Sequence, residues 1–324
     1  MKAIVVSTPG GPETLELRDV PDPVPAEGEV VVDVRATALN RVDLLQRRGL
    51  YPPPPGASDV LGLECAGVVS SLGAGVSRVK AGDRVMALLA GGGYAERVAV
   101  AERLLLPIPR GFSFEQAAAL PEAFLTASEA LFGVGRVAPG ELVLVHAAAS
   151  GVGTAALQLA RERGARIVAV ASGPKLERLR ALAPARFVDR TREDFVAAVL
   201  DESGGRGADV IVDFVGAAYA ARHAECLAVL GRHVLVGLLG GAKAEVDFGR
   251  LLARRQSLLG MVMRSRPLVD KIAVTERFRR EWLHRFDDGR LVTVVDSVFP
   301  LAHAARAHAH METNTNVGKI VLGV

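Results

Sequence analysis

The sequence predicts an α/β protein in which a β-rich domain is joined to a doubly wound domain built on a parallel sheet. Up to about residue 110, short apolar runs alternate with Gly, Pro and Asp turns, which is typical of strands. From residue 142 to 238, apolar strands alternate with amphipathic helices. Strands separated by helices imply right-handed βαβ units and therefore a parallel sheet. A length of 324 residues fits about two such domains.

Composition excludes several classes of protein. Half of the residues are apolar and 23% are charged, which is typical of a folded globular chain. The longest apolar runs, 142–145 and 234–239, fall far short of the ~18 residues of a membrane span. The apolar stretch at the start of the chain is too short for the apolar region of a signal peptide. The two cysteines form no CxxC pair, so neither a disulfide scaffold nor a structural zinc module is expected. We expect a cytoplasmic protein of enzyme size.

The first part of the chain contains five predicted strands, each β-branched or apolar and bounded by turn residues. They are residues 3–6, 29–38, 64–72, 84–89 and 95–100. A proline-rich stretch, YPPPPG at 51–56, lies between the second and third strands. Such a stretch can serve as a polyproline ligand, but inside a strand-rich domain it is better explained as a stiff surface loop.

The period changes after residue 113, and strands then alternate with helices. The predicted helices are 114–132, 151–163, 174–182, 193–202 and 219–230, and the predicted strands are 142–146, 166–171, 210–214 and 233–238. Two more helices, 269–285 and 301–311, precede a last strand at 319–322. We therefore divide the chain into a β-rich domain (1–118), a doubly wound domain with the alternation of a nucleotide-binding fold (119–260) and a C-terminal segment (261–324) that returns to the first domain.

The segment LVLVHAAASGVGTAALQLAR (142–161) gives the sharpest functional signal. A buried strand runs into a turn of small residues, and a helix opens at Gly151. Small residues let the backbone approach a pyrophosphate, and the helix N-terminus supplies N–H donors. The strict GxGxxG pattern is not met, because Ala148 and Ser150 occupy its first two glycine positions and only Gly153 matches the third. The flanking strands and helix nevertheless favour a dinucleotide site over mere tight packing.

The end of the next strand indicates which dinucleotide is bound. NAD sites usually place Asp or Glu there to accept a hydrogen bond from the ribose 2′-hydroxyl. Here the stretch VAVASGPKLERLR (168–180) has no acid at the strand end; Ser172 and Lys175 stand there, and Arg190 begins a later loop. Hydroxyl and cationic donors suit a 2′-phosphate, so NADPH is expected. The alternative is an ordinary solvated helix start.

Several ordered blocks resemble the zinc-free quinone oxidoreductase (zeta-crystallin-like) branch of the medium-chain dehydrogenase/reductase superfamily, most closely the tumour-suppressor-inducible quinone oxidoreductases. The blocks are ALNRVDLLQRRGLY (38–51), PPPGASDVLGLECAGVV (53–69), MALLAGGGYAERV (86–98), PEAFLTA (121–127), HAAASGVGTAALQLAR (146–161) and NTNVGKIVL (314–322). The resemblance covers nearly the whole chain. It implies a GroES-like catalytic domain, a Rossmann NADPH-binding domain and an active site between them.

The resemblance also implies roles for individual residues. Asn40, Tyr51 and Thr126 are expected to line the nicotinamide and acceptor pocket, where an amide and hydroxyls would stabilise charge on a reduced oxygen. The positions expected to contact cofactor are Asn40, Thr126, Ser150, Gly151, Val152, Gly153, Ser172, Lys175, Arg190, Gly237, Leu238, Met261, Met263, Asn316 and Lys319. Asp43 is either a carboxylate near this pocket or a helix-capping acid. Arg190 stands about where many relatives have a Tyr.

No metal is expected. Zinc-dependent members of the superfamily use a Cys in the segment that here holds Asn40 and a His–Glu pair where this chain has Leu63 and Glu64. Tetrahedral zinc needs at least three N, S or O ligands, which these positions do not offer. His303, His308 and His310 lie on one predicted helix and form a weaker metal candidate; surface histidines are the better interpretation.

We therefore expect an NADPH-dependent quinone reductase that transfers hydride without a metal. One alternative is an NADPH-dependent enone or enoyl reductase, because the cofactor would be the same and the sequence does not determine the shape of the acceptor pocket. The other is an NADPH-binding protein with an RNA-binding or regulatory role, because residues 250–285 hold ten basic against three acidic side chains. A solvated or intersubunit basic face explains that segment better, so nucleic acid is not expected as a partner. The resemblance implies a homodimer or homotetramer; the preferred acceptor stays open.

Overall fold

The computed structural model describes residues 1–324 and divides the chain into two compact units. The first unit comprises Met1–Leu125 and Met263–Val324, and the second comprises Thr126–Val262. The division thus falls a few residues after each of the predicted domain boundaries, 118 and 260. No helix is both long enough and apolar enough to cross a membrane.

The first unit is built on a seven-stranded sheet of order β14-β15-β3-β4-β5-β7, with β6 also pairing β3. Its strands are β1 (Lys2–Val6), β2 (Leu15–Asp19), β3 (Glu29–Ala38), β4 (Glu64–Leu72), β5 (Arg84–Leu88), β6 (Arg97–Ala101), β7 (Leu105–Pro107), β14 (Val295–Pro300) and β15 (Lys319–Gly323). Its helices are α1 (Arg41–Arg47), α2 (Phe114–Ala118), α9 (Leu268–Phe278), α10 (His284–Asp287) and α11 (Ala304–Glu312). Helix α3 (Pro121–Ser128) carries the chain into the second unit.

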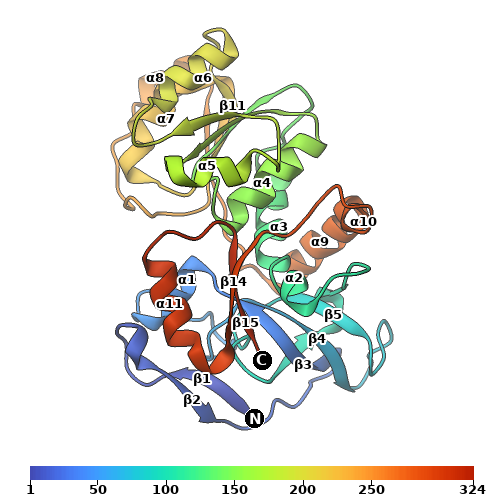
Figure 1. Ribbon diagram of the computed structural model, residues 1–324. Helices are drawn as coiled ribbons and strands as arrows, with labels where there is room; N and C mark the ends of the chain where they lie inside the picture. Colours follow the sequence, from blue (N-terminus) through green and yellow to red (C-terminus); the bar gives the residue numbers. More distant parts are fainter. The chain divides into compact units, whose positions relative to one another are not determined.

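The C-terminal segment completes the sheet of the first unit. Strand β15 pairs antiparallel with β3, with Val321 opposite Ala38, and β14 lies parallel to β15. Figure 1 shows these red strands beside the blue β3. The Leu39 N–H donates to the Ile320 carbonyl at 2.8 Å, so the start of β15 lies against the residues that follow β3. This pairing brings Lys319 to Asn40.

The second unit is a parallel sheet covered by helices, as the alternation of strands and helices predicts. Its strands are β8 (Leu142–Val145), β9 (Arg166–Ala171), β10 (Arg186–Asp189), β11 (Ala208–Asp213), β12 (Leu227–Leu235) and β13 (Ser257–Gly260). Its helices are α4 (Gly151–Glu162), α5 (Gly173–Leu179), α6 (Phe195–Ser203), α7 (Ala220–Cys226) and α8 (Phe248–Ala253). Across the sheet the strand order is β10-β9-β8-β11-β12-β13. The chain thus adds strands first on one side of β8 and then on the other, as in a Rossmann fold.

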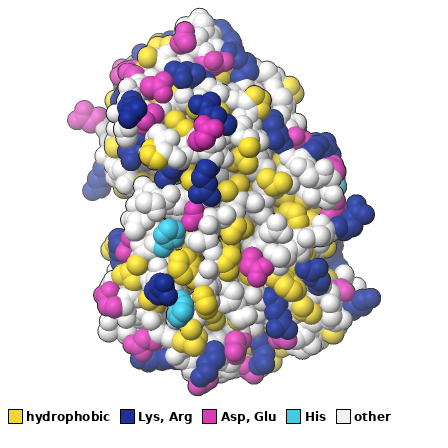
Figure 2. Space-filling model, in the orientation of Figure 1, with side chains coloured by type: hydrophobic (Ala, Val, Ile, Leu, Met, Phe, Trp, Pro, Cys, Tyr) yellow, Lys and Arg dark blue, Asp and Glu magenta, His cyan; other side chains and the backbone are white.

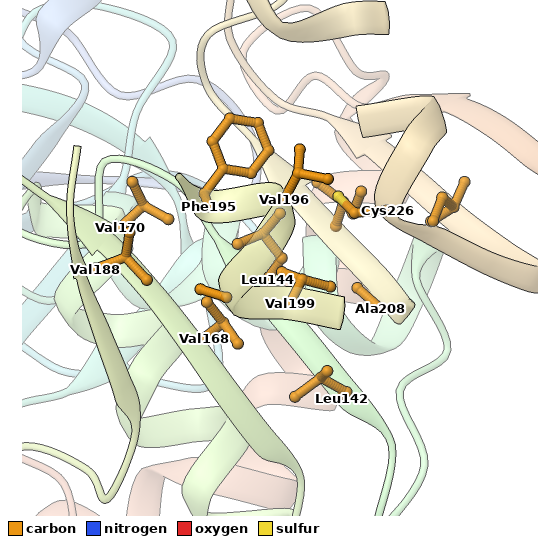
Figure 3. Close-up of a cluster of buried hydrophobic side chains, with 13 residues drawn as sticks. Leu142, Leu144, Val168, Val170, Val188, Phe195, Val196, Val199, Ala208 and Cys226 are labelled. Atoms are coloured by element: carbon orange, nitrogen blue, oxygen red, sulfur yellow. The ribbon is translucent and has the colours of Figure 1, made fainter. Parts of the chain in front are cut away.

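One face of this sheet forms a dry core with α6. Leu144 of β8 and Val168 of β9 are fully buried against Val199 of the helix, and Cys226 closes the cluster (Figure 3). Burial of the Cys226 thiol raises its pKa to about 12, so it behaves as an apolar side chain. Burying an aliphatic side chain contributes roughly 1.5–3 kcal/mol, which is what holds α6 on the sheet.

The structure corrects two predicted helices. The predicted helix 114–132 is divided into α2, α3 and a π-helical segment, Glu129–Val134. Pro121 is the reason: it has no N–H to continue α2, but its fixed φ suits the first position of α3. The predicted helix 219–230 ends at Cys226, and Leu227 already pairs with Ala208 of β11. The predicted strand 233–238 therefore begins earlier and ends at Leu235.

Candidate functional site

Asn40 and Asp43 form the turn that joins β3 to α1. Asn40 is the N-cap of α1, and the Asp43 Oδ2 accepts a hydrogen bond from the Asn40 N–H at 2.7 Å. An acid three residues after the N-cap is the capping-box arrangement. Of the two interpretations of Asp43, the structure therefore supports the helix-capping acid. Because Asp43 is 1% exposed, burial raises its pKa to about 6.

A buried ion pair fixes the Asn40 side chain. Lys319 Nζ donates to Asn40 Oδ1 at 2.6 Å and to the Leu39 carbonyl at 2.7 Å, and it lies 2.7 Å from Glu64 Oε1. Glu64 is fully buried and Lys319 is 5% exposed. The second oxygen of Glu64 accepts from the Glu122 N–H at 2.8 Å. All three ammonium donors of Lys319 are thus engaged within the first unit.

The ion pair also determines which way the Asn40 amide faces. Its oxygen meets the ammonium, and its nitrogen donates to Glu64 Oε1 at 3.0 Å and to the Ala38 carbonyl at 3.3 Å. A flipped amide would set its NH₂ against the ammonium and its oxygen against the carboxylate, so only one orientation is favourable. The longer bond, to Ala38, is the weaker one. Its hydrogen is the one that Asn40 can offer to another acceptor.

A chain of buried polar groups runs from Asp43 to the surface. The Tyr94 hydroxyl donates to Asp43 Oδ2 at 3.0 Å and faces His308 Nε2 at 3.2 Å. Arg47 donates to His308 Nδ1 at 3.2 Å and pairs with Glu312 at 2.5 Å. Since Arg47 can only donate, the neutral His308 must carry its hydrogen on Nε2 and donate it to Tyr94.

The expectation of surface histidines fails at His308, which is fully buried. Burial and the neighbouring Arg47 lower its pKa to about 3. His310 instead faces Asp296 at 3.0 Å. The three histidines of this segment therefore do not converge on one point, and His308 belongs to the network behind Asp43.

Three other predicted residues lie in the first unit: Tyr51, Asn316 and Met263. Arg264 donates to the Gln46 side chain at 2.7 Å and lies over the Tyr51 ring, 5.4 Å from its centroid. Tyr51 is thereby held against α1, the helix that Asn40 caps. Asn316 is 8% exposed and donates to the Gly318 carbonyl at 3.1 Å, so it shapes the turn before Lys319. Met263, 5% exposed, begins the C-terminal part of this unit.

In the second unit, the predicted phosphate turn lies between β8 and α4. Ser150 caps α4 by accepting from the Gly153 N–H at 3.0 Å, which leaves the N–H groups of Gly151 and Val152 without intrahelical partners. A Cβ on Gly153 would lie 2.7 Å from the Ala148 Cα, so only glycine fits here. The open helix end suits an anion.

The region after β9 holds the predicted 2′-phosphate groups. Ser172 is the N-cap of α5 with no side-chain cap bond, and the Lys175 N–H donates to the Ser172 carbonyl at 2.9 Å. Arg190 follows β10, and its N–H donates to the Ala171 carbonyl at 2.9 Å. An acid not assigned from the sequence lies nearby: Asp189 accepts from Thr191 and Gly173, and the Thr191 bonds lower its pKa.

Of the remaining predicted cofactor residues, Gly237, Leu238 and Met261 follow strands at the same edge of this sheet. The N–H groups of Val236 and Gly237 both donate to the Asp213 carbonyl, which turns the chain before the exposed Leu238. Met261 follows β13 and donates to the Leu235 carbonyl at 3.0 Å. Thr126, 4% exposed on α3, begins the second unit. In open α/β sheets this carboxyl edge is where ligands bind.

Comparison with known proteins agrees with this arrangement. Residues 26–110 match the alcohol dehydrogenase GroES-like domain, and residues 182–322 match the zinc-binding dehydrogenase family. A quinone oxidoreductase of Pseudomonas aeruginosa is 35% identical over 99% of both chains. The chain belongs to the medium-chain dehydrogenase/reductase superfamily.

Solved structures of this superfamily resemble the chain over its whole length. The Escherichia coli quinone oxidoreductase, solved as a complex with NADPH, has a TM-score of 0.90 at 30% identity and covers 100% of both chains. An NAD-dependent alcohol dehydrogenase has a TM-score of 0.89 at 36% identity, also covering 100% of both chains. The CurK enoyl reductase has a TM-score of 0.88 at 29% identity and covers 99% of this chain and 98% of its own.

The matched family is described as zinc-binding, but the side chains around Asn40 do not form a set of zinc ligands. Glu64 is already paired with the Lys319 ammonium, and its neighbour Leu63 is a buried apolar residue. The other nearby candidate, Cys65, is fully buried, and burial raises the pKa of its thiol to about 12. A single carboxylate paired with an ammonium cannot provide the three or four ligands that zinc requires.

Proposed function

We propose that the protein is an NADPH-dependent quinone reductase of the zinc-free branch, which transfers hydride from the nicotinamide to a quinone without a metal. The observation that carries this proposal is the Lys319–Glu64–Asn40 group. It is a buried, fully hydrogen-bonded arrangement that presents an amide rather than metal ligands. The nicotinamide supplies the hydride, and the chain supplies orientation and polar groups for the acceptor.

Asn40 is the proposed donor to the reduced oxygen. As hydride reaches a quinone ring, negative charge develops on an oxygen, and a preorganised N–H stabilises it. The Asn40 hydrogen that now makes the 3.3 Å bond to Ala38 is the one available for that oxygen. Tyr51 and Thr126 are proposed to complete the pocket. Water can protonate the quinol anion, so the reaction needs no dedicated acid.

The second unit is proposed to hold NADPH, with the pyrophosphate at Gly151–Gly153 and the 2′-phosphate at Ser172 and Lys175. The NADPH complex of the similar E. coli quinone oxidoreductase supports this choice of cofactor. The carboxylate of Asp189 lies at the same helix start, but it is already bonded to Thr191 and Gly173. We propose that Lys175 and Arg190 provide the cationic contacts there.

Reduction of a C=C bond conjugated to a carbonyl is the second candidate, favoured by the likeness to the CurK enoyl reductase. Both reactions place hydride on carbon and negative charge on oxygen, so Asn40 would serve either. Which of the two reactions occurs depends on whether the pocket admits a quinone ring or a conjugated enone.

The test is oxidation of NADPH and NADH at 340 nm by EDTA-treated protein, with 1,2-naphthoquinone, 1,4-benzoquinone and 2-cyclohexenone as acceptors. Rates without protein are subtracted, because quinones oxidise NADPH slowly on their own. Turnover of a quinone with NADPH after chelation is the expected result. Turnover of the enone alone would select the second candidate, and loss of quinone turnover on chelation, with the protein still folded by circular dichroism, would refute the metal-free proposal.

The RNA-binding alternative loses support, because much of the basic segment 250–285 is engaged within the protein. Arg250, Arg254 and Arg279 donate to backbone carbonyls, and Arg264 is 5% exposed. On the face drawn in Figure 2, basic and acidic side chains are interspersed. A nucleic-acid site instead requires a contiguous basic patch.

We propose that the protein is a homodimer formed through β13, the edge strand of the second unit's sheet. An unpaired edge exposes backbone donors and acceptors that a second copy can satisfy. Leu258 on this strand is 51% exposed, and Phe248 and Leu252 of the preceding α8 are 73% and 79% exposed. Light scattering after size exclusion should give twice the 34.1 kDa chain mass, and L258R should give the monomer. V24R, at an 85% exposed site in the first unit, is the matched control.

A further inference from the structure

Three histidines and an aspartate gather inside the second unit, apart from the groups discussed so far. His146 follows β8, Asp213 ends β11, His223 lies on α7 and His233 lies on β12. Asp213 and His223 are fully buried, His146 is 1% exposed and His233 is 9% exposed. Neither hydride transfer nor the phosphate turn uses these side chains. Four buried polar groups from four elements need a physical explanation.

Asp213 directs one oxygen to the backbone and the other mainly to the histidines. Its Oδ1 accepts from the N–H groups of Val215 and Gly216 at 2.7 and 3.1 Å. Its Oδ2 lies 2.8 Å from His233 Nε2 and 3.4 Å from His223 Nδ1, with a further contact of 3.2 Å to the Gly216 N–H. The carboxylate is therefore oriented so that Oδ2 faces two imidazole nitrogens.

His223 is held from its other side and has an unused nitrogen. Its Nε2 lies 2.9 Å from His146 Nε2, whereas its Nδ1 makes no hydrogen bond. Arg222, the nearby cationic side chain, is ion-paired with Asp194. A carboxylate oxygen that faces two imidazole nitrogens is the kind of ligand set that divalent metal ions bind.

We propose that Asp213 Oδ2, His223 Nδ1 and His233 Nε2 form a binding site for one divalent transition-metal ion of the Zn²⁺ class. One ligand atom from each of these three residues lies within 4.8 Å of the other two. Tetrahedral zinc with N and O ligands at about 2.0–2.1 Å separates its ligands by about 3.3 Å. The Asp213–His223 separation of 3.4 Å already fits, and the His233 ring has to withdraw by about half an ångström from its 2.8 Å contact.

His146 is the outer partner of this site. Metal-ligating histidines almost always bond through their second ring nitrogen to another group, which fixes the ring and its tautomer. His146 Nε2 makes that contact to His223, and the Phe195 ring lies edge-on to His146 at 4.8 Å between centroids. His233, the most exposed of the four, marks the side from which an ion would enter.

The proposed ion would join β11, α7 and β12, so it would stabilise the second unit. A ligand that binds only the folded state raises the unfolding temperature with its concentration. The site does not depend on the proposed reductase activity. The Asp213 carbonyl also accepts from the N–H groups of Val236 and Gly237, so the ion would brace the turn that carries Leu238.

The experiment adds Zn²⁺ or Co²⁺ to the full-length, EDTA-stripped and desalted protein. Equilibrium dialysis with elemental analysis is expected to give one ion per chain. Bound Co²⁺ is expected to show the strong visible absorption of a four-coordinate site. Zn²⁺ should raise the midpoint of thermal unfolding by several degrees. H223Q and H233Q should lose the bound ion and the shift, whereas H146Q should weaken binding by about 10–100-fold.

H310Q is the matched control, because His310 also contacts a carboxylate, Asp296, but in the first unit. Circular dichroism and melting in EDTA show whether each variant is folded; H233Q, at the most exposed ligand, is the variant most tolerant of substitution. Binding of less than about one ion per ten chains by the parent protein would overturn the proposal. So would equal binding by folded H233Q, or loss of binding in H310Q instead.

Discussion

Replacing Lys319 with methionine would leave the Glu64 carboxylate buried without its cation. The two side chains are 6% and 0% exposed and lie 2.7 Å apart. Removing one partner of a buried pair typically costs about 3–5 kcal/mol, because the remaining charge stays desolvated. The Leu39 carbonyl and Asn40 Oδ1 also lose their donor. Against a typical domain stability of about 5–15 kcal/mol, K319M should lose a large part of the free energy of unfolding.

The double variant K319M/E64Q separates the unpaired charge from lost packing. Glutamine is neutral and keeps an acceptor for the Glu122 N–H, so the second substitution should restore about 2 kcal/mol or more. Urea unfolding followed by fluorescence of Trp282, the single tryptophan, reports on the first unit. K2M is the control: the Lys2–Asp19 pair has the same 2.7 Å separation but is 48% and 79% exposed, so solvent screens it and K2M should change the free energy of unfolding little. A loss in K319M no larger than in K2M, or no recovery in the double variant, would refute this reasoning.

Three further predictions concern the cofactor and pH. G153V should abolish NADPH binding, because the new side chain meets the backbone of Ala147 and Ala148. Fluorescence quenching or calorimetry measures the dissociation constant. A dissociation constant within tenfold of the parent's would contradict the assignment of the pyrophosphate to this turn. K175A should weaken the binding of NADPH far more than the binding of NADH. The control K243A, at an exposed site in the same unit, should change the affinity for neither cofactor. Equal weakening of both affinities would show that Lys175 does not contact the 2′-phosphate. Asp43, with its pKa raised to about 6 by burial against ~3.9 when unfolded, adds stability that is full below about pH 4 and is lost as pH rises through 6. D43N should therefore gain about 2 kcal/mol relative to the parent between pH 4 and pH 7 in urea unfolding, and a constant difference would exclude this titration.

Local pattern was enough to predict much of the fold. Strands β3 and β4 begin and end where their apolar runs do, and α4 begins at Gly151 as its capping serine requires. These elements depend on residues close in sequence. The predicted helix 219–230 ends early because Leu227 pairs with Ala208 of β11, and that long-range pairing outweighs helix propensity.

The chemistry of the site was less accessible. Lys319 and Asn40 could be assigned only by resemblance, since 279 positions separate them and the β15–β3 pairing joins them. Glu64 was not assigned at all, because lysine and glutamate are normally surface residues and nothing local signals a buried pair. The cluster of Asp213 and the three histidines could not be predicted either. Its members lie on or directly after four different elements, β8, β11, β12 and α7, and their sequence spacing matches no metal motif.

The charge balance around Asn40 bears on the acceptor proposed for it. The Lys319 ammonium is cancelled by Glu64 at 2.7 Å, so the group presents a dipole, not a net charge, to whatever binds beside Asn40. A dipolar N–H stabilises a developing oxyanion by less than a Lewis-acidic ion does. Such a site suits an acceptor that already takes hydride readily and delocalises the resulting charge, as a quinone does, better than a simple ketone. K319M/E64Q, which keeps the site neutral, should therefore retain more quinone turnover than K319M. An equally large loss in both folded variants would mean that the ammonium itself acts on the acceptor.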